Sequence, residues 1–126
     1  MKKLIAILAV MFSTDAAAFS GTGNDRIDEA REYMRRVTGG ADINYELVNY
    51  WLGVVSGMSQ VYSHEGYKYR VCYPKGSNVG QIAEIAARYL IDHPEERAKQ
   101  LWFLIWQSHS DAFGFADKNC WLNTEE

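Results

Sequence analysis

The chain has few of the residues from which catalytic and metal sites are built. Its 126 residues include three His and two Cys, and these show no metal-ligand spacing such as Cys-x-x-Cys or His-x-x-x-His. No glycine-rich phosphate loop is present, because neither Gly76 nor Gly80 follows a strand or precedes a Lys-Ser/Thr pair. No two carboxylates have a context that would separate their pKa values into acid and base. The sequence gives no positive evidence for an enzyme, and we expect no cofactor and no metal.

An excess of positive charge is also missing. The formal net charge is −3, and without residues 1–18 the chain keeps 11 basic and 15 acidic residues. Neither Arg35-Arg36 nor the pair of Lys68 and Arg70 is dense enough to form a phosphate-binding surface. We therefore expect a partner other than nucleic acid or anionic lipid.

Long apolar runs are absent except near the N-terminus. Met1-Lys2-Lys3 precedes nine apolar residues, Leu4 to Phe12, and Ala16-Ala17-Ala18 follows soon after. Nine helical residues span about 14 Å, which is too short for a bilayer core of roughly 30 Å. This pattern favours a cleaved export signal over residues 1–18, with an N-terminal membrane anchor as the alternative.

Export would place a single domain, residues 19–126, in the periplasm without membrane attachment. Cys72 and Cys120 are the only cysteines, and that compartment is oxidising. A disulfide closing a loop of about 50 residues would stabilise the domain by on the order of 4 kcal/mol. The alternative is a catalytic thiol paired with His64 or His109. We favour the disulfide, because an exported protein with two cysteines usually leaves neither free.

Apolar periodicity is helical almost throughout residues 19–126 and predicts an all-α fold, a small bundle of about four helices. The first helix is expected from a cap at Asn24 or Asp25 to Gly39-Gly40, the second from Tyr45 to Tyr62, the third from a cap at Asn78, and the fourth from Pro94 to about Phe113. We expect up-and-down packing or nearly so.

Two glycines interrupt the second predicted helix. Gly53 and Gly57 lie four residues apart, and each costs a helix about 1 kcal/mol relative to alanine. This cost suggests a helix-packing notch, where the backbone of another helix approaches closely. The alternative is a helix that is only slightly weakened.

The fourth predicted helix carries six consecutive large apolar residues, 101–106, which cannot all face one core. Either this helix is central and enclosed by the other three, or part of it meets a second subunit. We favour a homodimer, with Trp102, Phe103 and Trp106 as candidates for its interface.

The longest connection, residues 63–78, has the composition of a binding surface. Its candidate contact residues are His64, Glu65, Tyr67, Lys68, Tyr69 and Arg70. Tyr, Trp and Arg dominate interface hot spots, and a disulfide at Cys72 would hold the base of the loop and reduce the ordering cost of binding. We predict that this loop contacts a partner, with Asp42 as a second candidate. The alternative is an ordinary solvated loop.

Several residues together resemble the Rap/Tai immunity proteins of type VI secretion systems. The pattern is Cys72-Tyr-Pro-x-Gly76, Gln81, Tyr89-Leu90-x-x-His93-Pro94-Glu95-x-Arg97, Ala112-Phe113 and Cys120, with residues 50–57 similar to the second helix of that family. The resemblance covers roughly residues 27–120. This chain departs from the family by lacking a cysteine pair in the first two helices, where Trp51 stands near the expected second position, and by a longer segment before Cys120.

The resemblance implies a small, exported, all-helical and usually dimeric protein. Such proteins bind and block a peptidoglycan-cleaving amidase effector that is delivered into the periplasm, and so protect the producing cell. Which effector is bound does not follow from the resemblance. The alternative function is a periplasmic acid-stress chaperone, which would expose the apolar residues 101–106 when a dimer dissociates at low pH.

Overall fold

The computed structural model describes residues 21–115, and these form four α-helices without a β-strand. The helices are α2 (Ile27–Val37), α3 (Tyr45–Tyr62), α4 (Val79–Asp92) and α5 (Leu101–Phe113), with short 3-10 helices η1 (Asn24–Arg26) and η2 (Pro94–Glu96). The predicted all-α class is confirmed for this part of the chain, and so are the bounds of α3.

Two predictions concern residues that the structure does not describe. The export signal, residues 1–18, and Cys120 both lie outside residues 21–115. Signal cleavage and the bridge between Cys72 and Cys120 therefore stay predictions. Within the described range, no helix combines the length and the apolar character that crossing a membrane requires.

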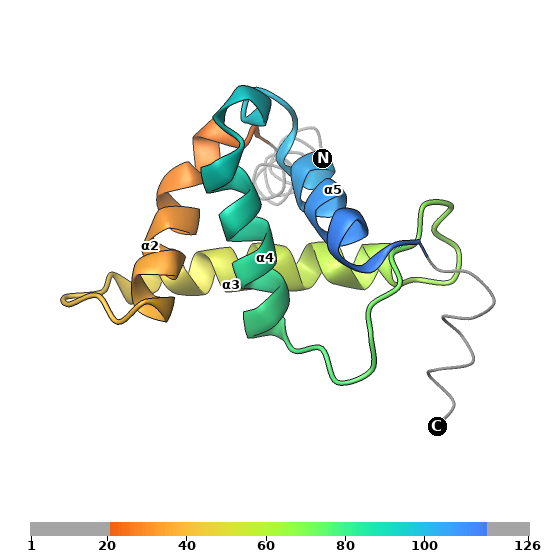
Figure 1. Ribbon diagram of the computed structural model, residues 1–126, viewed down its shortest axis with the longest axis horizontal. Coiled ribbons are helices and arrows are strands. Elements are labelled where there is room, and N and C mark those ends of the chain that lie inside the picture. Colours follow the sequence, from red (N-terminus) through yellow and green to blue (C-terminus); the bar gives the residue numbers. More distant parts are fainter. Residues whose placement is uncertain (1–20, 116–126) are drawn as a thin grey trace, which may run out of the picture.

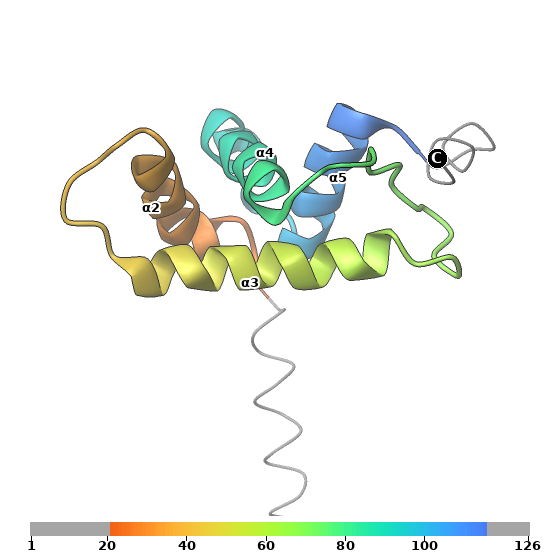
Figure 2. The same ribbon diagram turned by 90° about the horizontal axis from the view of Figure 1, so that it is seen from below.

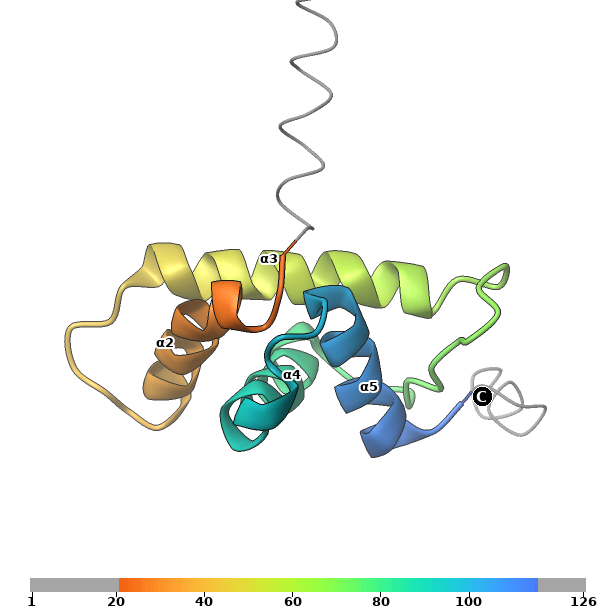
Figure 3. The ribbon, with the colours of Figure 1, turned by 90° about the horizontal axis from the view of Figure 1, so that it is seen from above.

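The helices do not pack up and down as expected. α2, α4 and α5 lie side by side in one layer with α4 in the middle, and α3 runs across one side of that layer (Figures 1, 2 and 3). α3 has 18 residues, which gives about 27 Å of helix, enough to cross all three neighbours. The connection over residues 63–78 is long enough to lead the chain from the end of α3 back to the middle of the layer.

Each of the other three helices donates a side-chain hydrogen bond to a carbonyl in the first turns of α4. These bonds run from the Tyr33 hydroxyl to Gly80 (2.8 Å), from Trp51 Nε1 to Ala83 (2.9 Å) and from His109 Nε2 to Ile82 (2.9 Å). α4 also meets its neighbours through small side chains, since three of its fully buried residues are alanines: Ala83, Ala86 and Ala87. α4 is thus the central helix. From sequence, the central position had been one of two alternatives for the helix that carries residues 101–106, which is α5.

The start of α2 differs from the prediction, whereas its end agrees. Arg26 is the N-cap residue of α2, and its side chain makes no capping bond. Asp25 lies one residue earlier, and its carboxylate accepts a bond from the Thr22 N–H at 2.8 Å. The predicted cap at Asn24 or Asp25 is therefore wrong. Beyond the last turn, Gly39 has φ 83°, a left-handed conformation that stops the helix as expected.

The predicted fourth helix is broken between η2 and α5. Residues 21–24 lie against residues 97–101, and three backbone bonds join the two segments: Gly23 N–H to the Lys99 carbonyl (3.1 Å), Asn24 N–H to the Arg97 carbonyl (2.9 Å) and Leu101 N–H to the Gly21 carbonyl (2.8 Å). These groups would otherwise have formed the continuous helix. Because a distant segment binds them, α5 begins at Leu101 and not at Pro94.

The close approach predicted at Gly53 is wrong. Gly53 is exposed, and a Cβ built on it meets no atom within 4 Å, so none of the other helices approaches it. A tight position is Gly23, where a Cβ would lie 2.7 Å from Leu104 Cδ1 and 3.1 Å from the Arg97 backbone. Gly57 is half-buried, and its close contact stays a prediction.

Alanine substitutions at the two glycines should have opposite effects. Gly53→Ala should raise the free energy of unfolding by up to about 1 kcal/mol, since alanine favours the helix and fits open space. Gly23→Ala should lower it by about 1–3 kcal/mol, because the new methyl group would lie 2.7 Å from the buried Leu104 side chain and 3.1 Å from the Arg97 backbone. Urea unfolding of both variants measures the difference, and equal effects would contradict this account of the packing.

Candidate functional site: a closed loop beside an aromatic hollow

The loop that follows α3 is closed at its base. The Val71 N–H donates to the Tyr62 carbonyl at 3.0 Å, so the chain enters and leaves the loop at one place. The Val71 side chain is buried, and its backbone forms an isolated β-bridge with Phe115. Inside the loop, the Tyr67 N–H donates to the His64 carbonyl at 3.0 Å. A compact loop with joined ends presents its side chains from a fixed base.

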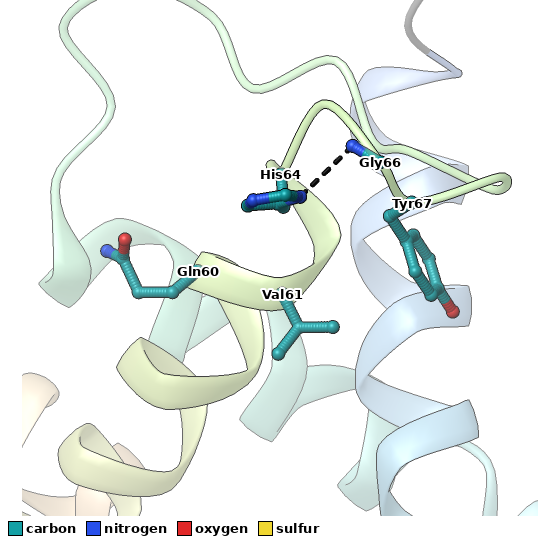
Figure 4. A pocket seen from close by; sticks show the side chains of 5 residues that line it. All are labelled: Gln60, Val61, His64, Gly66 and Tyr67. Carbon is teal, nitrogen blue, oxygen red and sulfur yellow. Dashed lines mark hydrogen bonds between the residues drawn. The ribbon is translucent and has the colours of Figure 1, made fainter.

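The predicted contact residues of this loop differ in exposure. His64, Glu65, Lys68 and Tyr69 are exposed, whereas Tyr67 and Arg70 are partly buried. His64 Nδ1 accepts a bond from the Gly66 N–H at 3.0 Å (Figure 4). Lys68 Nζ lies 5.3 Å from the centre of the Tyr69 ring, close enough for a cation–π contact. The loop therefore combines both signs of charge with aromatic rings.

Asp42, the second predicted contact, lies far from the loop. It belongs to the turn before α3, whereas the loop follows the other end of the same helix (Figure 2). The 18 residues of α3 separate the two by about 27 Å. Asp42 also has a left-handed backbone, with φ 53°. The structure thus does not bring Asp42 and the loop into one small site.

One hollow opens beside the loop, and we call it the loop hollow. Its volume is about 470 Å³, and it is lined by Gln60, Val61, His64, Gly66 and Tyr67 (Figure 4). The prediction from sequence missed Gln60 and Val61. Helical spacing could have identified them, because they lie four and three residues before His64, at the end of α3.

A second hollow lies between the loop and α5, and we call it the aromatic hollow. It measures about 210 Å³ and is lined by Tyr67, Tyr69, Trp102, Phe103 and Trp106. The Tyr69 and Trp106 rings are 6.1 Å apart, and Trp106 Nε1 donates to the Tyr69 carbonyl at 2.8 Å. The predicted partner loop and the predicted dimer interface are therefore parts of one surface.

Buried polar side chains hold the loop and its base to α4 and α5. The Tyr62 hydroxyl donates to the Trp102 carbonyl, and the Tyr73 hydroxyl donates to His109 Nδ1 at 2.7 Å. His109 Nε2 donates to the Ile82 carbonyl, which places a proton on Nε2. Burial lowers the pKa of His109 and raises the pKa of Tyr73 and Tyr62. Both ring nitrogens of His109 are thus occupied, which leaves none for the alternative pairing with the Cys72 thiol.

Within residues 21–115, no three His, Cys, Asp or Glu side chains gather where they could hold a metal ion.

Comparison with known proteins identifies no relative: no protein-family model, no curated protein and no solved structure matches the chain.

The buried His109 predicts a loss of stability in mildly acidic solution. Its lowered pKa means that the unfolded chain takes up a proton near pH 6.5, whereas the folded chain takes it up only at lower pH. The free energy of unfolding should then fall as the pH drops from 7 to 5, by at most about 1.4 kcal/mol per unit. Urea midpoints measure this fall, and His109→Gln should show a weaker pH dependence. An equally steep fall in both proteins would contradict the assignment.

Proposed function

We propose that this protein is an immunity protein, which binds and blocks a peptidoglycan amidase delivered into the periplasm by type VI secretion. The observation that carries the proposal is the closed loop over residues 63–70, which stands beside the loop hollow with Lys68 and Tyr69 exposed. An inhibitor must cover a cleft with groups that are already in place, since ordering them on binding costs affinity. The resemblance to Rap/Tai proteins supplies the class of partner.

The contact is made by the exposed side of the loop. His64, Glu65 and Lys68 offer polar groups of both charge signs, and the tyrosines offer the large rings that dominate interface hot spots. Val71 fixes the base of the loop through its bond to the Tyr62 carbonyl. This fixed base lets the loop enter or lie across the active-site groove of the amidase with little ordering.

The proposal includes export of residues 19–126 to the periplasm and a disulfide between Cys72 and Cys120. The Cys72 N–H donates to the Gly114 carbonyl at 2.9 Å, so Cys72 lies beside the point from which the chain continues towards Cys120. Cys120 lies only five positions after Phe115, which keeps the second cysteine within reach. The bridge would then fasten the end of the loop to the segment after α5.

Dimerisation through Trp102, Phe103 and Trp106 stays a prediction. Trp102 is 45% exposed, and Phe103 and Trp106 are partly buried against the core. An apolar face of this kind is typical of an interface. The two hollows share only Tyr67 among their described lining residues, so an amidase could use the loop hollow while the aromatic hollow is covered.

A periplasmic acid-stress chaperone is the second candidate, and the aromatic hollow favours it, since such chaperones bind clients through exposed apolar surface. The two functions differ in their response to acid. A chaperone should bind apolar dyes and lose a dimer near pH 3, whereas the immunity protein should bind one amidase tightly at neutral pH.

Substitutions in the exposed part of the loop should weaken inhibition. We expect the double variant Glu65→Ala and Lys68→Ala to lose at least about tenfold in affinity for the cognate amidase, because both side chains lie at the proposed contact. Calorimetry measures the binding, and peptidoglycan hydrolysis measures the inhibition.

Asp42→Asn is the matched control, since it removes a charge at the other end of α3 while asparagine tolerates the left-handed backbone. It should bind as the unchanged protein does. A loss of binding in Asp42→Asn with none in the loop variant would place the contact at the opposite end. Failure of every amidase effector to bind would refute the immunity function and leave the fold as described.

Loss of the disulfide should destabilise the protein. Cys120→Ser should lower the free energy of unfolding by up to about 4 kcal/mol relative to the oxidised protein. Urea unfolding with and without a reducing agent measures this, and reduction should have little effect on the Cys120→Ser variant. If reduction leaves the unchanged protein equally stable, the bridge is absent.

A further inference from the structure

The aromatic hollow is an unusually apolar piece of surface. Among residues 21–115, the five that line it are all aromatic, and Trp102 and Tyr69 are 45% and 52% exposed. Phe115 continues this face, since its ring lies 5.7 Å from Trp106 and the residue is 56% exposed. Exposed aromatic clusters of this kind normally have an occupant. Because the hollow offers few polar groups, that occupant is apolar.

The segment that follows Phe115 carries a matching apolar pair. Residues 116–126 include Trp121 and Leu122, the only large apolar side chains in that segment. The chain leaves the described part at Phe115, which itself contacts the hollow through Trp106. Trp121 lies six positions after Phe115, a stretch of chain that can span up to about 20 Å. The pair therefore starts from the rim of the hollow and is within reach of it.

Charges at the edges of the hollow complement the same segment. Lys68 Nζ lies 5.3 Å from the centre of the Tyr69 ring, and Lys99 Nζ lies 5.7 Å from that of Phe103. Lys99 also pairs with Glu96, whereas Lys68 stands at the exposed loop edge. Glu125 and Glu126 follow Trp121-Leu122 in the sequence, so they can approach these lysines once the apolar pair is seated.

We propose that Trp121 and Leu122 of this same chain occupy the aromatic hollow. A tethered segment meets the hollow at an effective concentration in the millimolar range, above that of a second copy in dilute solution. The docked segment covers Trp102 and packs against Tyr69, and it thereby holds one side of the loop. Docking of Trp121 and Leu122 in the aromatic hollow does not depend on which protein binds the loop.

Contacts between Trp121 or Leu122 and the hollow can be observed directly by NMR in protein exported to the periplasm of an expressing bacterium. We expect nuclear Overhauser effects from the Leu122 methyl groups and the Trp121 indole to the rings of Trp102 and Tyr69. Their absence in the unchanged, folded protein would overturn the proposal, and this readout needs no variant.

Substitution of the anchors supplies a second readout. In the double variant Trp121→Ala and Leu122→Ala, the fraction of molecules with an open hollow should rise about tenfold or more, measured as binding of an apolar fluorescent dye. Lys118→Ala, in the same segment but before Cys120, is the matched control and should bind dye as the unchanged protein does. Equal dye binding by the unchanged protein and the double variant would overturn the proposal.

The competing occupant is a second copy of the chain. Sedimentation of the unchanged protein and of the variants distinguishes the two occupants. The proposal fails if the unchanged protein is a dimer, Trp102→Ala makes it a monomer, and the Trp121 and Leu122 substitutions leave it dimeric. The hollow is then a dimer interface. The proposal is supported if the unchanged protein is a monomer and dye binding rises in the Trp121 and Leu122 double variant but not in Lys118→Ala. Neither outcome involves an amidase, so this test is separate from that of the immunity function.

Discussion

The fold depends on the first turns of α4, where side chains of three other helices meet. Tyr33, Trp51 and His109 come from α2, α3 and α5, and each donates a hydrogen bond to a carbonyl between Gly80 and Ala83. All three donors are buried, so an unmade bond would leave a polar group without water. These bonds set where each neighbouring helix stands along α4, and the small alanines of α4 let them approach closely.

The candidate site is held by the same arrangement. His109 binds α4 on one side and the Tyr73 hydroxyl on the other, so the base of the loop is tied to the central helix. Trp106 lies one turn earlier on α5 and donates to the Tyr69 carbonyl within the loop. A binding loop positioned by a buried network loses less freedom when it meets a partner. Core packing and loop geometry are therefore coupled through α5.

Sequence periodicity predicted the helices well where the determinants are local. The bounds of α3 and the Asn78 cap of α4, whose side chain accepts from the Gln81 N–H at 2.9 Å, follow from neighbouring residues. The same reasoning failed for the helix predicted from Pro94, because backbone bonds between residues 21–24 and 97–101 interrupt it after η2. It failed at Gly53 because a pattern within one helix does not tell which face will be covered.

The sequence by itself determined the helical class and the composition of the loop, since both depend on residues close together in the chain. It also indicated that the six large apolar residues 101–106 cannot all face one core, and Trp102 is indeed exposed. Only the tertiary structure decided that Tyr69 and Trp106, 37 residues apart, form one surface, and that Asp42 is remote from it. The physical reason is that helix crossing and loop closure depend on long-range bonds and packing, which no local period encodes.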